Sequence, residues 1–111
     1  MFKNVRYVIV RVSDVSKMVS FWRDNIGLKP SYVTSVWSEI PLENIVIALL
    51  HDEDASPKRT GVVFEVDGIR EIVEKLKARG VKVSEISDIG SGLLAFFNDP
   101  EGNEYEIFQP R

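Results

Sequence analysis

Two kinds of hydrophobic pattern alternate along this chain, one typical of strands and one typical of helices. Residues 5–12 form a nearly continuous apolar run, rich in β-branched side chains and too short for a buried helix, which predicts a strand. The next segment has one apolar stripe at helical spacing, formed by Val15, Met18, Val19, Trp22 and Ile26. Asp14 is placed to cap this helix and Gly27 to end it. Strands are then predicted at 31–36, 37–40 and 45–50.

The same order of patterns begins again after a charged stretch, 51–60, that has no apolar periodicity. Residues 62–66 predict a strand, Asp67 is placed to cap a second helix, and Gly80 to end it. The stripe of this helix is Ile69, Ile72, Val73 and Leu76. Strands are predicted at 81–83, 93–97 and 105–108.

The two halves are interpreted as copies of one strand–helix–three-strand unit, because Val12 corresponds to Val66 and Trp22 to Leu76 at the same offset. One such unit, with a single amphipathic helix and a small sheet, buries both sheet faces poorly. The expected fold is therefore α+β, with two tandem βαβββ modules that form a curved, mostly antiparallel sheet and carry the helices on its outer face. A single domain is predicted, with module one at 1–52, a linker at 53–60 and module two at 61–111. The concave inner face is the expected place for a small molecule.

The last strand carries the most informative charge. Asp99-Pro100 followed by Gly102-Asn103 predicts a tight turn between two apolar strands. The strand after this turn has one carboxylate, Glu106, between bulky apolar neighbours. Glu106 is either an exposed charge on a half-solvated sheet, which is the commoner case, or a functional group that faces a cavity.

The composition excludes several classes of function. A length of 111 residues is enough for one domain with a core, and a net charge of −3 offers no basic surface for nucleic acid. No apolar run is long enough to cross a membrane. The chain has no cysteine, which excludes disulfides, thiolate metal ligands and a cysteine nucleophile, and which fits a cytoplasmic protein. The single histidine, His51, opens the charged stretch and is expected on the surface.

Three segments together resemble a known family: VSD at 12–14, FWRDNIGL at 21–28, and DPEGN at 99–103 with Glu106 after it. They are similar to the vicinal oxygen chelate superfamily, also called glyoxalase/bleomycin resistance protein/dioxygenase, over essentially the whole chain. The resemblance implies a divalent metal held at four positions, one on the first and one on the last strand of each unit. These positions fall on Tyr7, Ala48, Gly61 and Glu106. Only Glu106 has a ligand-type side chain, so we expect no metal and no other cofactor.

Strand alternation, with Tyr7 placed inside, assigns the other residues of the concave face. The expected pocket is aliphatic and aromatic with a few charges, and its members are Tyr7, Ile9, Arg11, Trp37, Ala48, Leu50, Gly61, Val63, Glu65, Phe97, Glu106 and Phe108. The charges allow two interpretations. They form an Arg–Glu pair that fixes the register of the two units, or they bind a cationic or hydroxyl group of a ligand beside a stacking surface.

Three functions are compatible with this pattern. The first is metal-independent binding of a small organic molecule, as in the bleomycin resistance branch that the chain resembles. The alternative is a glyoxalase- or dioxygenase-type enzyme (a lyase, isomerase or oxygenase) with a divergent site in which Glu106 is the catalytic acid–base group. The third is a structural or regulatory homodimer whose cup is filled by its own side chains. The resemblance also implies a homodimer in the first two cases.

Overall fold

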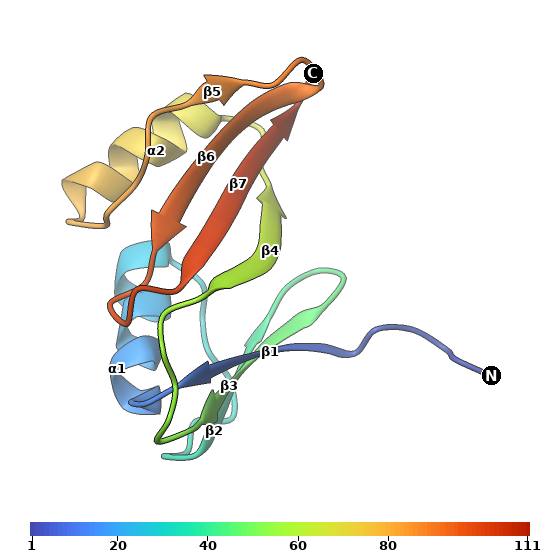
Figure 1. Ribbon diagram of the computed structural model, residues 1–111, viewed down its shortest axis with the longest axis vertical. Coiled ribbons are helices and arrows are strands. Elements are labelled where there is room, and N and C mark those ends of the chain that lie inside the picture. The colour runs from blue at the N-terminus through green and yellow to red at the C-terminus, as the bar shows by residue number, and fades with distance from the viewer. The chain divides into compact units, whose positions relative to one another are not determined.

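The computed structural model describes all 111 residues, 1–111, and divides into two compact units, Met1–Ser56 (unit 1) and Pro57–Arg111 (unit 2) (Figure 1). The elements of unit 1 are β1 (Tyr7–Val12), α1 (Val15–Ser20), the π-helical segment η1 (Phe21–Ile26), β2 (Trp37–Pro41) and β3 (Val46–His51). Those of unit 2 are β4 (Arg59–Glu65), α2 (Ile69–Ala78), β5 (Ser87–Asp88), β6 (Gly92–Asn98) and β7 (Glu104–Pro110). The α+β class and the tandem βαβββ units are confirmed.

Each sheet places its first strand beside its last. The strand order is β1-β3-β2 in unit 1 and β4-β7-β6-β5 in unit 2. The β1–β3 and β4–β7 pairs are parallel, and the remaining pairs are antiparallel. A parallel pair requires a long crossover, which the helical segment of each unit provides. The two sheets therefore share one topology, as expected of a duplication.

Each helix packs on one face of the sheet of its own unit (Figure 1): α1 contacts β2 and β3, and α2 contacts β6 and β7. Most of the predicted stripe residues are buried: Val15, Met18, Val19 and Trp22 in unit 1 and Ile69, Val73 and Leu76 in unit 2. The remaining two, Ile26 and Ile72, are half-buried. A fully buried aliphatic or aromatic side chain contributes roughly 1.5–3 kcal/mol. No helix is both long enough and apolar enough to cross a bilayer.

The two helices begin in different ways. Asp14 caps α1 as predicted, because its Oδ1 accepts a hydrogen bond from the Lys17 backbone N–H at 3.0 Å. The prediction that Asp67 caps α2 is wrong. The N-cap is Gly68, and the free N–H of Ile69 donates instead to Oε1 of Gln109 at 2.8 Å. A side chain of β7, distant in sequence, therefore satisfies the start of α2.

Two predicted strands are shorter than expected. Segment 31–36 makes only one bridge, between Ser31 and Glu39, and segment 81–83 only one, between Val83 and Phe97. One edge of the unit 2 sheet is instead the short β5, and the strand at the other edge, β4, begins at Arg59, before the predicted end of the linker. Edge segments have a partner on one side only, so the apolar pattern constrains their pairing weakly.

The turn at 99–103 forms as predicted. Oδ1 of Asp99 accepts hydrogen bonds from the backbone N–H groups of Glu101 and Asn103, at 2.9 and 3.0 Å. Gly102 takes the positive φ of 83° that such a turn requires. The turn fixes the start of β7 and hence the place of every side chain along it.

Candidate functional site

The side chains of unit 1 that point away from α1 form a surface that we call sheet face 1. The strand register aligns them in rows, and the members are Tyr7, Ile9, Arg11, Trp37, Glu39, Val46, Ala48 and Leu50. The alternate positions Val10 and Val12 are buried, whereas Arg11 is exposed and Ile9 is 47% exposed. The expected placement of Tyr7, Ile9 and Arg11 on one face, with the valines behind them, agrees with this pattern.

Tyr7, Trp37 and Glu39 meet on sheet face 1. The indole Nε1–H of Trp37 donates to Oε2 of Glu39 at 2.9 Å, and the Tyr7 hydroxyl lies 3.5 Å from the same oxygen, a longer and weaker contact. The two rings are 5.5 Å apart, edge to face at 83°. All three groups are half-buried. They form a compact cluster, the aromatic–carboxylate cluster, around one acidic group.

Ala48 explains how this cluster forms across three strands. Tyr7 is on β1 and Trp37 on β2, and β3 runs between them. Ala48 is in the central row of β3, opposite Ile9 on one side and Glu39 on the other. Its methyl group is 0% exposed although it points away from α1. A small side chain at this position leaves the rings room to meet above the middle strand.

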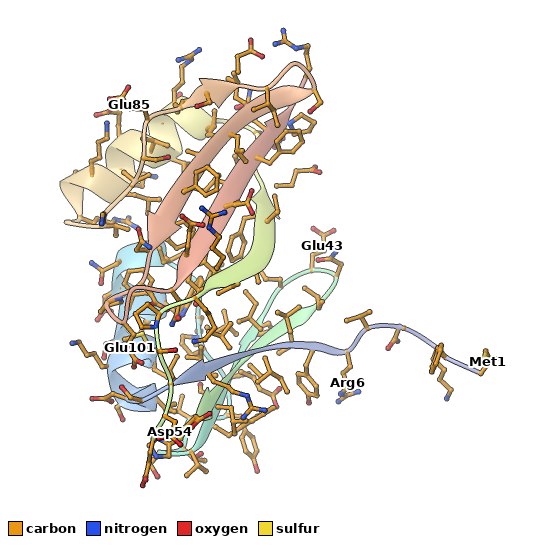
Figure 2. All side chains as sticks on the ribbon, viewed as in Figure 1. Met1, Arg6, Glu43, Asp54, Glu85 and Glu101 are labelled. Carbon is orange, nitrogen blue, oxygen red and sulfur yellow. The ribbon has the colours of Figure 1, made fainter.

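Two arginines lie near this cluster. The guanidinium of Arg6, just before β1, is 5.3 Å from the centre of the Tyr7 ring (Figure 2 labels Arg6). Side-chain hydrogen bonding to Tyr7 and, more weakly, the charge of Glu39 raise the pKa of Arg6. Arg11 is directed to the end of its strand, where it lies 3.9 Å from Asp52. The cluster thus already attracts one cation of the chain, at its solvent-exposed edge.

The corresponding surface of unit 2 is sheet face 2. Its members, from the register of β4, β6 and β7, are Val63, Glu65, Leu94, Phe96, Asn98, Glu104, Glu106 and Phe108. Val63 is 52% exposed, and Glu65 is exposed beside Phe108. Gly61, two residues before Val63, has φ 74° at a register irregularity of β4, and no heavy atom lies within 4 Å of where its Cβ would be.

Glu106 occupies the centre of sheet face 2. It is half-buried on β7, with Val63 as its partner on β4 and Phe96 as its partner on β6. Its carboxylate makes no hydrogen bond or ion pair with the protein, whereas Glu104 on the same strand is 3.4 Å from Arg59. A half-buried carboxylate with apolar neighbours and no partner is costly for a purely structural residue. Glu106 is therefore available to a ligand.

The central rows of the two faces correspond to each other. The row is Ile9–Ala48–Glu39 in unit 1 and Val63–Glu106–Phe96 in unit 2. Each row has one carboxylate, but it is on the last strand in unit 2 and on the neighbouring strand in unit 1. The central row of each face thus contains one acid, on a different strand in each unit.

The prediction that Phe97 lines the pocket is wrong. It pairs with Tyr105, stacks on that ring at 5.1 Å, and is 2% exposed in the core of unit 2. Phe96 is the aromatic residue beside Glu106. Neighbouring strand residues point to opposite faces, so the adjacent Phe96 and Phe97 exchange roles when the parity is assigned incorrectly.

Glu39 is the site residue that the sequence did not indicate. Its signal was its position two residues after Trp37, which places both side chains on one face of a strand. The four positions implied by the resemblance lie on the first and last strands of each unit and do not include this residue of β2. His51, by contrast, is exposed as expected, and its Nδ1 is 3.0 Å from the Ser13 carbonyl oxygen.

The donors at the four implied metal positions do not fit a divalent ion. Ala48 and Gly61 have no donor atom in their side chains, and the Tyr7 hydroxyl is directed at Glu39. Divalent ions in proteins take several carboxylate, imidazole or thiolate ligands. No group of three or more His, Cys, Asp or Glu side chains converges anywhere in the chain. We therefore derive no chemistry through a metal.

These features define a class: a tandem βαβββ protein with one helix-covered face and one partly open face on each sheet. The chain belongs to the Glyoxalase/Bleomycin resistance protein/Dioxygenase superfamily, whose family model matches residues 4–107. Known structures with the same fold include TnmS3, an antibiotic binding protein from Streptomyces sp. CB03234. It has a TM-score of 0.86 and 22% identity, and the match covers 99% of this chain and 98% of that one.

Two further known proteins are similar to this chain. The fosfomycin resistance protein FosX from Listeria monocytogenes has a TM-score of 0.82 at 17% identity, with 100% of this chain and 96% of that one covered. An Arabidopsis thaliana protein described as "Probable lactoylglutathione lyase, chloroplastic" is 26% identical over 125 residues, which cover 96% of this chain. The match spans only 36% of the length of that relative.

Proposed function

We propose that this protein binds a small organic molecule without a metal ion. The observation that carries the proposal is Glu106, a half-buried carboxylate without a protein partner between Val63 and Phe96. Such a group is useful when a ligand supplies the missing hydrogen bond or charge. The similar fold of an antibiotic binding protein supports a binding role.

The proposal assigns ligand contacts to each sheet face by itself. In unit 1 the contacting residues are Tyr7, Ile9, Arg11, Trp37, Glu39, Ala48 and Leu50, and in unit 2 they are Gly61, Val63, Glu65, Phe96, Glu106 and Phe108. Aromatic side chains supply contact area at low entropic cost, and the carboxylates orient a polar group. No cofactor takes part.

The decisive experiment compares binding before and after metal removal. Protein purified without chelator is examined by native mass spectrometry to identify the compound it carries, and the affinity for that compound is measured with and without EDTA. We expect the same affinity in both cases, and a loss of at least tenfold in Glu106→Gln. Glu85→Gln, at an exposed position of unit 2 labelled in Figure 2, is the matched control and should bind normally. A divalent ion retained at one per chain, or affinity that EDTA abolishes, would contradict the proposal.

A lyase that uses Glu106 as acid–base group is the second candidate. It is favoured by the same unpartnered carboxylate and by the identity with the lactoylglutathione lyase relative. The test is formation of S-lactoylglutathione from methylglyoxal and glutathione by the metal-free protein. Turnover that Glu106→Gln abolishes would favour the enzyme over the binding protein.

A homodimer and a cytoplasmic location complete the proposal. The homodimer is supported by the edge strand β1, which has a strand neighbour on one side only, and by Phe2 and Val5 just before it, which are strongly exposed. Light scattering after size exclusion gives the mass directly, and Phe2→Ser with Val5→Ser should shift the protein toward monomer. The lack of cysteine is compatible with a reducing compartment.

A further inference from the structure

We propose that the aromatic–carboxylate cluster of Tyr7, Trp37 and Glu39 recognises a positively charged amine or guanidine group on an aromatic ligand. This inference deepens the proposed function and rests on it. It assigns a ligand class, organic cations, to a set of side chains that belong to unit 1 alone.

The first argument is the state of the Glu39 carboxylate. Its Oε2 accepts the Trp37 indole N–H and faces the Tyr7 hydroxyl, while no protein hydrogen bond goes to Oε1. No lysine or arginine forms an ion pair within 4 Å of it. The donors fix the position of the carboxylate, and it forms no ion pair. A negative charge held in place without an ion pair favours a cationic ligand group.

The second argument is Arg6. Its guanidinium lies over the Tyr7 ring at 5.3 Å, within the range of a cation–π interaction. Arg6 projects from the extended segment before β1 and is exposed (Figure 2), so the contact costs little to break. The chain itself thus shows that this aromatic surface accepts a cation, and that the cation can be exchanged for one from a ligand.

The third argument concerns the surroundings of the charge. Ile9, in the same row as Glu39, is 47% exposed, and Ala48 between them has only a methyl group. A ligand that places its cation at Glu39 can therefore lay an apolar body across Ile9. An anion at the same place would be repelled by Glu39, and Arg11 is directed toward Asp52, which leaves only the exposed Arg6 at the edge of the cluster to attract it.

The test uses three probes with one ring system and different charge: 1-naphthylmethylamine, 1-naphthylmethanol and 1-naphthoic acid. Binding is measured at neutral pH by titration calorimetry and by chemical-shift changes of the Trp37 indole N–H. We expect the amine to bind at least fivefold more tightly than the alcohol, and the acid more weakly than both. In Glu39→Gln the preference for the amine should fall below twofold, while the affinity for the alcohol stays the same.

Glu43→Gln is the matched control, because Glu43 is an exposed carboxylate in the turn after β2 (Figure 2) and the variant has the same net charge as Glu39→Gln. It should retain the preference. A Trp37 indole resonance that lies outside the range of unfolded tryptophan in the absence of probe shows that Glu39→Gln is folded, since the glutamine oxygen can still accept the indole N–H. Arg6→Gln should raise the affinity for the amine two- to threefold, and Lys3→Gln, which removes an exposed charge nearby in sequence, should not.

The outcomes separate this inference from the proposed function. If the alcohol binds as tightly as the amine, or if Glu43→Gln reduces the preference as much as Glu39→Gln, the cation assignment is wrong and metal-independent binding stands. If none of the probes binds, the assignment of aromatic cations is wrong. Failure of the proposed function is recognised separately, by a retained metal ion or by chelator-sensitive affinity for the compound that the protein carries.

Discussion

The hydroxyl of Tyr105 donates a hydrogen bond to Oδ2 of Asp99 at 3.0 Å, inside the core of unit 2. The same carboxylate accepts the side-chain N–H of Asn103 and two backbone N–H groups of its turn, four hydrogen bonds in all. Lys58 in turn donates to Oδ1 of Asn103 at 2.9 Å. The turn before β7 is therefore anchored by a buried charge that is fully hydrogen-bonded, and this turn sets the position of Glu106.

Removal of the Tyr105 hydroxyl should lower the stability of the protein. A hydrogen bond to a charged group contributes roughly 1.5–3 kcal/mol, so we expect Tyr105→Phe to reduce the free energy of unfolding by about that amount. Asp99→Ala should cost more, because it leaves several buried donors without an acceptor. Urea denaturation measures both. Tyr32→Phe is the control, since Tyr32 is 72% exposed, and an equal loss in this variant would contradict the explanation.

Tyr105 should also make the protein sensitive to alkali. Burial, and then the negative charge of Asp99, raise the pKa of Tyr105 well above its ordinary value. The unfolded chain releases this proton above about pH 10, whereas the folded protein retains it. The contribution to stability is thus complete below about pH 10 and falls as the pH rises, by roughly 1.4 kcal/mol per pH unit. Urea denaturation between about pH 9 and 11.5 should show a steeper loss for the wild type than for Tyr105→Phe; parallel profiles would count against a buried, protonated Tyr105.

The start of α2 should depend on Gln109 and not on Asp67. Oε1 of Gln109 accepts the first free N–H of the helix, and loss of such a capping acceptor costs about 1 kcal/mol. We expect this loss for Gln109→Ala and almost none for Asp67→Ala, whose side chain is exposed and makes no cap. Thermal or urea unfolding of the two variants provides the comparison. A larger effect at Asp67 would mean that the helix begins one residue earlier.

Enlargement of Ala48 should disrupt the aromatic–carboxylate cluster. The methyl group lies beneath the place where Tyr7 and Trp37 meet, and extra methylene groups in a filled space typically cost about 1–3 kcal/mol. We expect Ala48→Leu to lose about this much stability and to shift the Trp37 indole N–H resonance as it moves away from Glu39. Ala48→Ser, which is nearly the same size, should keep the resonance in place. An unperturbed indole in Ala48→Leu would show that the rings do not need this space.

The stripes and turns could be predicted because they depend on near neighbours in sequence. Val15, Met18 and Val19 are buried together since an α-helix repeats every 3.6 residues, wherever it packs. The Asp99 turn and the positive φ of Gly27 and Gly102 follow from the same local geometry. The duplication, the core and the family could all be inferred from such signals.

The candidate site depended on contacts that no local pattern contains. Glu39 on β2 contacts Tyr7 on β1 although β3 lies between these strands. Gln109 accepts the hydrogen bond of Ile69, which is forty positions earlier in the sequence. The position of Phe96 beside Glu106 depends on the register of β6 against β7, and an error of one residue replaces it by Phe97.

The sequence by itself determined most of the secondary structure, the repeat, the buried stripes and one carboxylate of the site. The tertiary structure decided which strands became neighbours and in what register. These pairings placed the second carboxylate, Glu39, beside its aromatic partners and buried Phe97 in the core of unit 2. The physical reason is that a strand fixes the alternation of its own side chains, whereas the hydrogen bonds to other strands decide which side chains meet.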